Sequence, residues 1–311
     1  MLNYVIFTLL IIISYFSSYF INKKLHNFDI PGDEKIHKKN VITSGGLIPF
    51  FLVSLIIFYL IYFKEYNSNF YNNIPQIWLA PVCILIFTTI SFLDDLNYIP
   101  FQIRLIAQII VVYFCISLFP VNYDFNFQTP IFNGFFPVKV DIIFTIFFWT
   151  FLINSTNFID GYDGMYSFQI TTNFIGLSII FSLLGENFHF YVSILMVLIG
   201  LIFIPFNLSN KYKLFIGDAG SIPSGFILGW MIISLINMGH LISALLLNLF
   251  FLADISFTLI DRILKKKSIF KRHNDFVFKK IIFKYGPKKY FLTAFIFQIL
   301  MVSGSILMVI F

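Results

Sequence analysis

The chain has 311 residues, of which 59% are apolar and only 12% are charged. Soluble domains carry about 25% charged residues, so this composition excludes an ordinary soluble protein. The net charge of +6 does not indicate nucleic-acid binding, because the basic residues follow a membrane pattern and do not alternate with aromatic residues.

Apolar runs of membrane-spanning length recur along the whole chain. A helix needs about 20 apolar residues to cross a bilayer core of about 30 Å. Ten runs are predicted to span, in chain order 2–21, 45–63, 76–93, 104–120, 139–157, 165–184, 188–207, 221–237, 241–260 and 290–311. The first run has no basic segment before it and no small-residue cleavage site after it, which predicts a retained span. The sequence therefore predicts an all-α, polytopic membrane bundle that forms a single domain over residues 1–311.

The loops between these runs predict the orientation of the chain. Lys and Arg number 19 in one set of alternate loops and 2 in the other. The basic set comprises 22–44, 94–104, 158–164, 208–220 and 261–289. Because basic loops stay in the cytoplasm, this set is predicted to be cytoplasmic and both termini external.

Two adjacent acids, Asp94 and Asp95, directly follow the apolar run that ends at Leu93. Neighbouring carboxylates at a helix end repel each other, and they become favourable when a cation lies beside them. A solvated helix end is an equally good explanation of the pair alone.

A second polar segment, residues 154–164, emerges from an apolar run. Asn154, Asn157 and Asp160 are three residues apart and would share one face of a helix, and Asp163 continues the step. Two glycines in the segment would let the backbone approach a ligand closely. A structural Asp-Gly turn is the alternative, but such a turn requires neither asparagine.

A third group, residues 217–221, reads Gly-Asp-Ala-Gly-Ser and precedes an apolar run. Free N–H groups at a helix N-terminus suit a phosphate, and Asp218 suits a magnesium ion that bridges it. An ordinary helix cap explains the same residues equally well.

The basic loop 261–289 forms a fourth group. Most of its lysines suit the anionic lipid surface. Arg262 can clamp a phosphate with two donors, and His273 can donate or shuttle a proton. Together the four groups predict one cytoplasmic site in which carboxylates hold a divalent cation and basic groups hold phosphates, as phosphoryl transfer requires.

From about residue 29 to residue 280 the sequence resembles the polyprenyl-phosphate N-acetylhexosamine-1-phosphate transferases. The matching motifs are Asp29-x-Pro31, Lys35-x-His37, Gly45-Gly46, Asp94-Asp95 with Arg104 and Gln108, Asn157-Phe-Ile-Asp160-Gly-Tyr-Asp163-Gly164, Gly217-Asp218-Ala219-Gly220-Ser221, Thr258-Leu259 with Arg262, and His273 with Phe278.

The resemblance implies about ten or eleven transmembrane helices with the active site at the cytoplasmic face. It implies transfer of a GlcNAc-like sugar-1-phosphate from a UDP-sugar to undecaprenyl phosphate, with release of UMP. The cofactor would be Mg²⁺, or Mn²⁺ in its place, and the location the bacterial cytoplasmic membrane among its lipids. A homodimer is compatible with this reading.

The resemblance also implies roles for individual residues. The catalytic residues would be Asp94, Asp95 and His273. The metal ligands would be Asp218, Asp94 and Asp163. The substrate-binding residues would be Lys35, His37, Asn154, Asn157, Asp160, Asp163 and Arg262.

Within the family, the Asn-Phe-x-Asp-Gly core is closer to the enzymes that start O-antigen, a part of lipopolysaccharide, than to the phospho-MurNAc-pentapeptide translocases. The histidine cluster of the translocases is absent, and Phe276 stands in the place of a second His. Tyr98, Glu34 and Ile42 replace an Asp, an Arg and a Pro that are common in the family.

Other functions remain as alternatives. A transporter would carry ionisable groups near the bilayer midplane, whereas here nearly all lie at one face and Asp254, inside the ninth predicted span, is the exception. A CDP-alcohol phosphotransferase would need Ala-Arg after Asp160-Gly161, and the sequence does not have it. A catalytically inactive family member is the third alternative.

Overall fold

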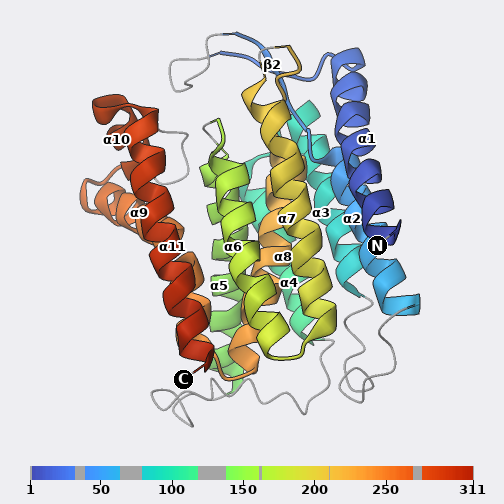
Figure 1. The fold of residues 1–311 in the computed structure, drawn as a ribbon. Coiled ribbons are helices and arrows are strands. Elements are labelled where there is room, and N and C mark those ends of the chain that lie inside the picture. The colour runs from blue at the N-terminus through green and yellow to red at the C-terminus, as the bar shows by residue number, and fades with distance from the viewer. Residues whose placement is uncertain are drawn as a thin grey trace.

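The computed structural model describes residues 2–31, 39–63, 79–117, 138–160, 163–209, 211–268 and 275–310. This part of the chain contains eleven helices and one two-stranded sheet (Figure 1). The helices are α1 (Leu2–Lys24), α2 (Leu47–Phe63), α3 (Leu79–Leu96), α4 (Phe101–Ser117), α5 (Val138–Ile159), α6 (Met165–Leu183), α7 (Asn187–Leu208), α8 (Asp218–Asn237), α9 (Leu241–Leu264), α10 (Val277–Tyr285) and α11 (Pro287–Ile310). Ten of them lie where the ten spans were predicted, which confirms the all-α prediction.

Seven of the described helices are long and apolar enough to cross a membrane: α1, α3, α5, α7, α8, α9 and α11. Helices α2 and α4 are apolar but shorter, with 17 residues each. Helix α6 buries the polar side chain of Asn173, whose amide donates to Asn248 of α9 at 2.9 Å within the bundle. Together these helices make the chain an integral membrane protein.

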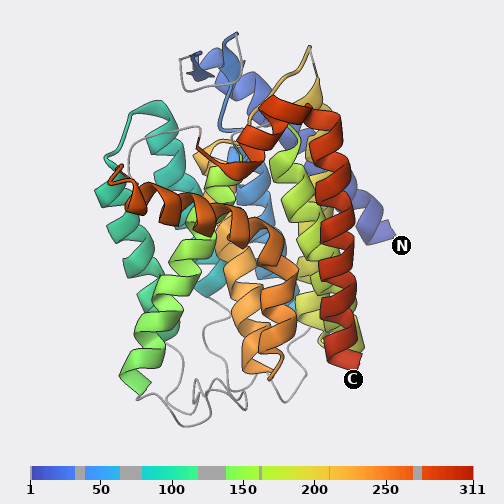
Figure 2. The same cartoon turned by 90° about the vertical axis from the view of Figure 1, so that its left-hand side faces the viewer.

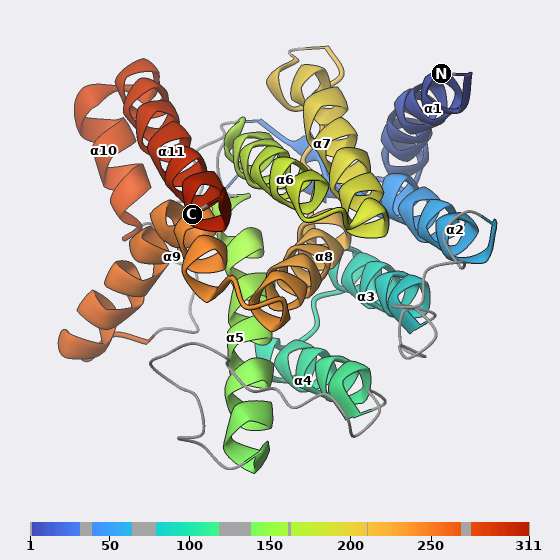
Figure 3. The same cartoon turned by 60° about the horizontal axis from the view of Figure 1, so that its bottom comes forward.

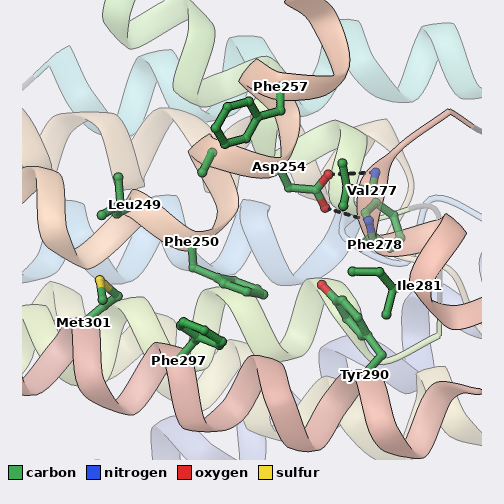
Figure 4. A pocket seen from close by; sticks show the side chains of 11 residues that line it. Leu249, Phe250, Asp254, Phe257, Val277, Phe278, Ile281, Tyr290, Phe297 and Met301 are labelled. Carbon is green, nitrogen blue, oxygen red and sulfur yellow. Dashed lines mark hydrogen bonds between the residues drawn. The ribbon is translucent and has the colours of Figure 1, made fainter. Parts of the chain in front are cut away.

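Helix α10 was not predicted, because it lies within the segment read as a basic loop. Its sequence alternates apolar and basic residues, and it buries Phe278 and Ile282. Asp254 of α9 holds its first turn, since the N–H groups of Val277 and Phe278 donate to the carboxylate at 2.9 and 3.0 Å (Figure 4). Asp254, the acid inside the ninth predicted span, is therefore a helix cap at the edge of an apolar pocket.

Helix α8 is the centre of the bundle, with α3 and α5 packed most closely against it (Figure 3). Small residues allow α5 to approach closely: a Cβ added to Gly225 would lie 2.6 Å from Cα of Ile153. Trp149 of α5 donates its indole N–H to the carbonyl of Phe226 at 3.0 Å. Because α5 ends and α8 begins at the same end of the bundle, this contact brings their polar ends together.

A small sheet closes that end of the bundle. Strand β1 (Phe28–Asp29) pairs antiparallel with β2 (Val41–Ile42), and Ile42 bridges to Leu214. A Cβ on Gly46 would lie 2.1 Å from Cα of Gly220, so the Gly45-Gly46 motif is needed for this close approach. Figure 2 shows that the C-terminal half of α9 also lies across the bundle axis near this end.

Candidate active site

Five charged side chains from four helix ends meet at the end of the bundle closed by the sheet. Asp94 and Asp95 lie in the last turn of α3, and Arg104 lies in the first turn of α4. Asp160 directly follows α5, and Asp218 is the first residue of α8. The prediction that Asp94, Asp160 and Asp218 lie at the same end of the bundle agrees with this arrangement.

Arg104 connects two of the carboxylates. Its Nη1 donates to Oδ2 of Asp94 at 2.5 Å and also to Oδ2 of Asp218. The other oxygen of Asp94 accepts the backbone N–H of Ile99 at 2.6 Å. Residues 94 and 218, far apart in the sequence, therefore share one cationic group.

The carboxylate of Asp95, from α3, caps the N-terminus of α8. It accepts the backbone N–H groups of Asp218 and Ala219, both at 3.2 Å. The hydroxyl of Ser44 donates to Oδ2 of Asp95 at 2.6 Å. Two N–H groups that the sequence suggested for a phosphate thus bind a carboxylate from α3, which satisfies the positive end of α8.

A buried polar network holds Ser44 in place. Ser44 has a φ of 59°, a left-handed conformation that is uncommon for residues other than glycine. The side-chain amide of Asn27 donates to the Ser44 hydroxyl at 2.7 Å, and that of Asn22 donates to the Ser44 carbonyl at 3.1 Å. The end of α1 is therefore connected to Asp95 through buried hydrogen bonds.

The predicted polar face of α5 contacts two neighbouring helices. Asn154 donates to Gln108 of α4 at 2.7 Å, and Asn157 accepts the hydroxyl of Ser221 of α8 at 3.0 Å. Beyond them, Asp160 accepts the N–H of Gly217. These contacts fix the register of α5 against α4 and α8.

The pKa of Asp160 lies well above its ordinary value. Burial is the largest cause, and the negative charges of Asp218 and Asp95 raise the pKa further. The N–H of Gly217 offsets this in part. A cation near Asp160 would therefore stabilise its ionised form.

Asp163 and Arg262 have other partners in this structure. Asp163 forms an ion pair with Lys213, whose ammonium lies 5.9 Å from the ring centre of Phe215. Arg262 pairs with Asp275 and donates Nε to the carbonyl of Ser268 at 3.0 Å. The proposed metal role of Asp163 and substrate roles of both residues stay predictions. Lys35, His37 and His273 lie outside the described residues.

Three residues important to this geometry were not assigned a role from the sequence. Ser44, Arg104 and Lys213 each contact an acid that is far away along the chain. Arg104 was already part of the matching motif with Asp94-Asp95, and its position as the lone basic residue of segment 94–104 was the signal that could have assigned it a role. Ser44 and Lys213 carry no comparable signal.

The donor set suits a divalent cation that substrates help to bind. Mg²⁺ prefers oxygen ligands, and proteins commonly supply one or two carboxylates while phosphates and waters complete the shell. Asp94 and Asp218 present oxygens to a single nitrogen of Arg104, so these two oxygens lie close enough for one ion. In the described ranges no group of three or more His, Cys, Asp or Glu is arranged for a metal.

Comparison with known proteins gives matches over this region. The model of Glycosyl transferase family 4 matches residues 77–236. A phospho-N-acetylmuramoyl-pentapeptide-transferase of Staphylococcus haemolyticus is 30% identical over 75% of this chain and 74% of its own length. The protein of that name from Nautilia profundicola is 25% identical over 66% of this chain and 63% of its own length. An undecaprenyl-phosphate alpha-N-acetylglucosaminyl 1-phosphate transferase of Thermotoga maritima is 27% identical over 85% of this chain and 76% of its own length.

Proposed function

Because the chain belongs to glycosyl transferase family 4, we propose that it transfers a sugar-1-phosphate from a UDP-sugar to undecaprenyl phosphate and releases UMP. The Thermotoga maritima relative, named for this reaction with N-acetylglucosamine, supports a GlcNAc-like sugar. The reaction would begin a cell-surface polysaccharide such as O-antigen.

The observation that carries the proposal is the pairing of Asp94 and Asp218 around one cationic group at the polar end of a membrane bundle. In phosphoryl transfer the protein positions the phosphates and neutralises their charge. An oxygen of the lipid phosphate attacks the phosphorus bonded to the sugar, and the diphosphate bond breaks with UMP as the leaving group. A bound Mg²⁺ would neutralise charge on the diphosphate.

The side chains divide this work by position. Asp94 and Asp218 would hold the cation, and Asn157, Asp160 and Asp163 would line the nucleotide side. Three donors hold the side chain of Asp95 at the start of α8, so it would position Asp218 as well as face the lipid phosphate. His273, Lys35 and His37 keep their predicted roles at the diphosphate and substrates.

The location follows from the same features. We expect a multi-pass protein of the bacterial cytoplasmic membrane, with the site facing the cytoplasm and both termini outside. The lipid substrate would reach the site from the inner leaflet, and the nucleotide sugar from water.

The test uses purified protein in detergent with Mg²⁺, undecaprenyl phosphate and a panel of radiolabelled UDP-sugars. Labelled lipid is expected with at least one sugar. Asp94→Asn, Asp95→Asn and Asp218→Asn should each lower the rate by orders of magnitude, since each removes a charge from the site. Asp261→Asn is the control, because Asp261 forms a solvent-exposed pair with Lys265 away from the cluster.

Near-normal rates in all three site variants would reject this site. Uptake of a solute without any lipid product would favour a transporter. No product with any UDP-sugar, together with full cellular function of Asp218→Ala, would favour an inactive family member.

A further inference from the structure

Arg104 takes the place between two carboxylates that a metal ion would take. Its Nη1 bonds to Oδ2 of both Asp94 and Asp218. Magnesium binds carboxylate oxygens at about 2.0–2.1 Å, within the space that this nitrogen fills. The guanidinium and an ion bridging the same two oxygens therefore exclude each other.

The charges around Arg104 explain why it lies there. Four acids, Asp94, Asp95, Asp160 and Asp218, surround the polar end of α8, and burial of like charges is unfavourable without a cation. The side chains of Asp94 and Arg104 are 8% and 19% exposed, so water screens this pair only in part. The guanidinium offsets the repulsion when no metal is bound.

The guanidinium also has unused capacity to bind an anion. Within the described part of the chain its Nε is buried and has no hydrogen-bond partner. Arginine presents five donors in a planar fork that matches phosphate oxygens. A phosphate at this position would satisfy the buried donor that the carboxylates leave unbonded.

We propose that Arg104 fills the cation position in the substrate-free protein and moves to the phosphate oxygens of the substrates when a divalent cation binds Asp94 and Asp218. The inference rests on the proposed function for the nature of the substrates. It makes Arg104 a competitor of the metal before substrates bind and a phosphate ligand afterwards.

The experiment measures Mn²⁺ binding to purified protein without substrates, by electron paramagnetic resonance of the free ion. Arg104→Gln removes the competing charge and should bind Mn²⁺ at least about tenfold more tightly than the native protein, since a unit charge at this range changes binding by that factor or more. The same variant should form labelled lipid far more slowly, because it lacks the phosphate ligand. Lys265→Gln removes one positive charge from the exposed end of α9 and should leave Mn²⁺ affinity unchanged.

Equal or weaker Mn²⁺ binding by a folded Arg104→Gln would overturn the proposal. Should that variant fail to fold, Arg104→Lys decides. Lysine is a shorter donor with a single ammonium group and competes less well for the two carboxylates, so this variant must also bind Mn²⁺ more tightly than the native protein. Tighter binding in a protein that makes no lipid product with any UDP-sugar would support the exchange of Arg104 and reject the proposed function. Formation of labelled lipid by the native protein, without tighter Mn²⁺ binding by Arg104→Gln, would support the proposed function and reject the exchange of Arg104.

Discussion

At the scale of single residues, the hydroxyl of Ser44 determines how Asp95 is held. A hydrogen bond to a charged group contributes about 1.5–3 kcal/mol, so losing it should lower kcat about tenfold to a hundredfold and change KM little. Ser44→Gly is the variant of choice, because glycine adopts the left-handed backbone at this position without strain. Steady-state kinetics check this prediction, provided that the variant melts at the same temperature as the native protein.

A matched control for that prediction is Ser14→Ala. Ser14 is also a buried serine, but its hydroxyl donates to the carbonyl of Ile11 within α1. This variant should keep both kcat and KM. An unchanged kcat in Ser44→Gly would contradict the role of the hydroxyl.

The raised pKa of Asp160 gives a second residue-scale prediction, about pH. A carboxyl whose pKa is higher in the folded than in the unfolded protein stabilises the fold while it is protonated. That contribution is lost as the pH rises from the unfolded value of about 3.9 through the raised folded value. Without divalent cations, the melting temperature should therefore fall over this range, and less steeply in Asp160→Asn. Equal slopes in the two proteins would show that Asp160 titrates normally.

The chemistry-bearing residues could be predicted, but their partners could not. Asp94, Asp95 and Asp218 stood out because charged groups next to an apolar run are energetically costly unless a cation or a ligand pairs with them. Their contacts join distant segments, Ser44 with Asp95 and Arg104 with Asp218, and the second pair lies more than a hundred residues apart in the sequence. No periodic pattern in the sequence predicts such pairs. The sequence also gave no sign that Asp95, and not a ligand, would bind the N-terminus of α8.

At the scale of elements, the contact between α5 and α8 sets the geometry of the site. Gly225→Ala would place a methyl group 2.6 Å from the Ile153 backbone, which cannot yield as a side chain would. Such overpacking costs about 1–3 kcal/mol, so the variant should melt at a lower temperature and lose activity as α5 and α8 move apart.

Gly304→Ala provides the control for this contact. Gly304 is a helical glycine of α11, and the nearest atom to its added Cβ would be 3.8 Å away, an ordinary contact. Its melting temperature and rate should equal those of the native protein. Equal behaviour of Gly225→Ala and Gly304→Ala would mean that the two helices are not held by close packing.

The elements themselves differ in how well the sequence predicts them. Long apolar runs gave ten helices because their length and composition leave few other structures in a membrane. Helix α10 was missed, since nine amphipathic residues among lysines also suit a surface loop. Its stability depends on the cap from Asp254, and that contact between α9 and α10 is invisible in a linear pattern.

At the scale of the whole molecule, the bundle places a water-facing polar site beside the lipid phase. The distribution of basic residues predicts that this end lies in the cytoplasm. A lipid phosphate and a nucleotide sugar can both reach such a site without crossing the membrane. This arrangement favours a transferase over a transporter, whose binding site would lie near the midplane.

The nucleotide that leaves the site tests the central claim most directly. The native protein would be incubated with undecaprenyl phosphate and a UDP-sugar labelled with ³²P on the phosphate bonded to the sugar. Transfer of a sugar-1-phosphate predicts that the label enters the lipid and that unlabelled UMP is released. Release of labelled UDP would contradict the account, because it would mean that the sugar moves without its phosphate.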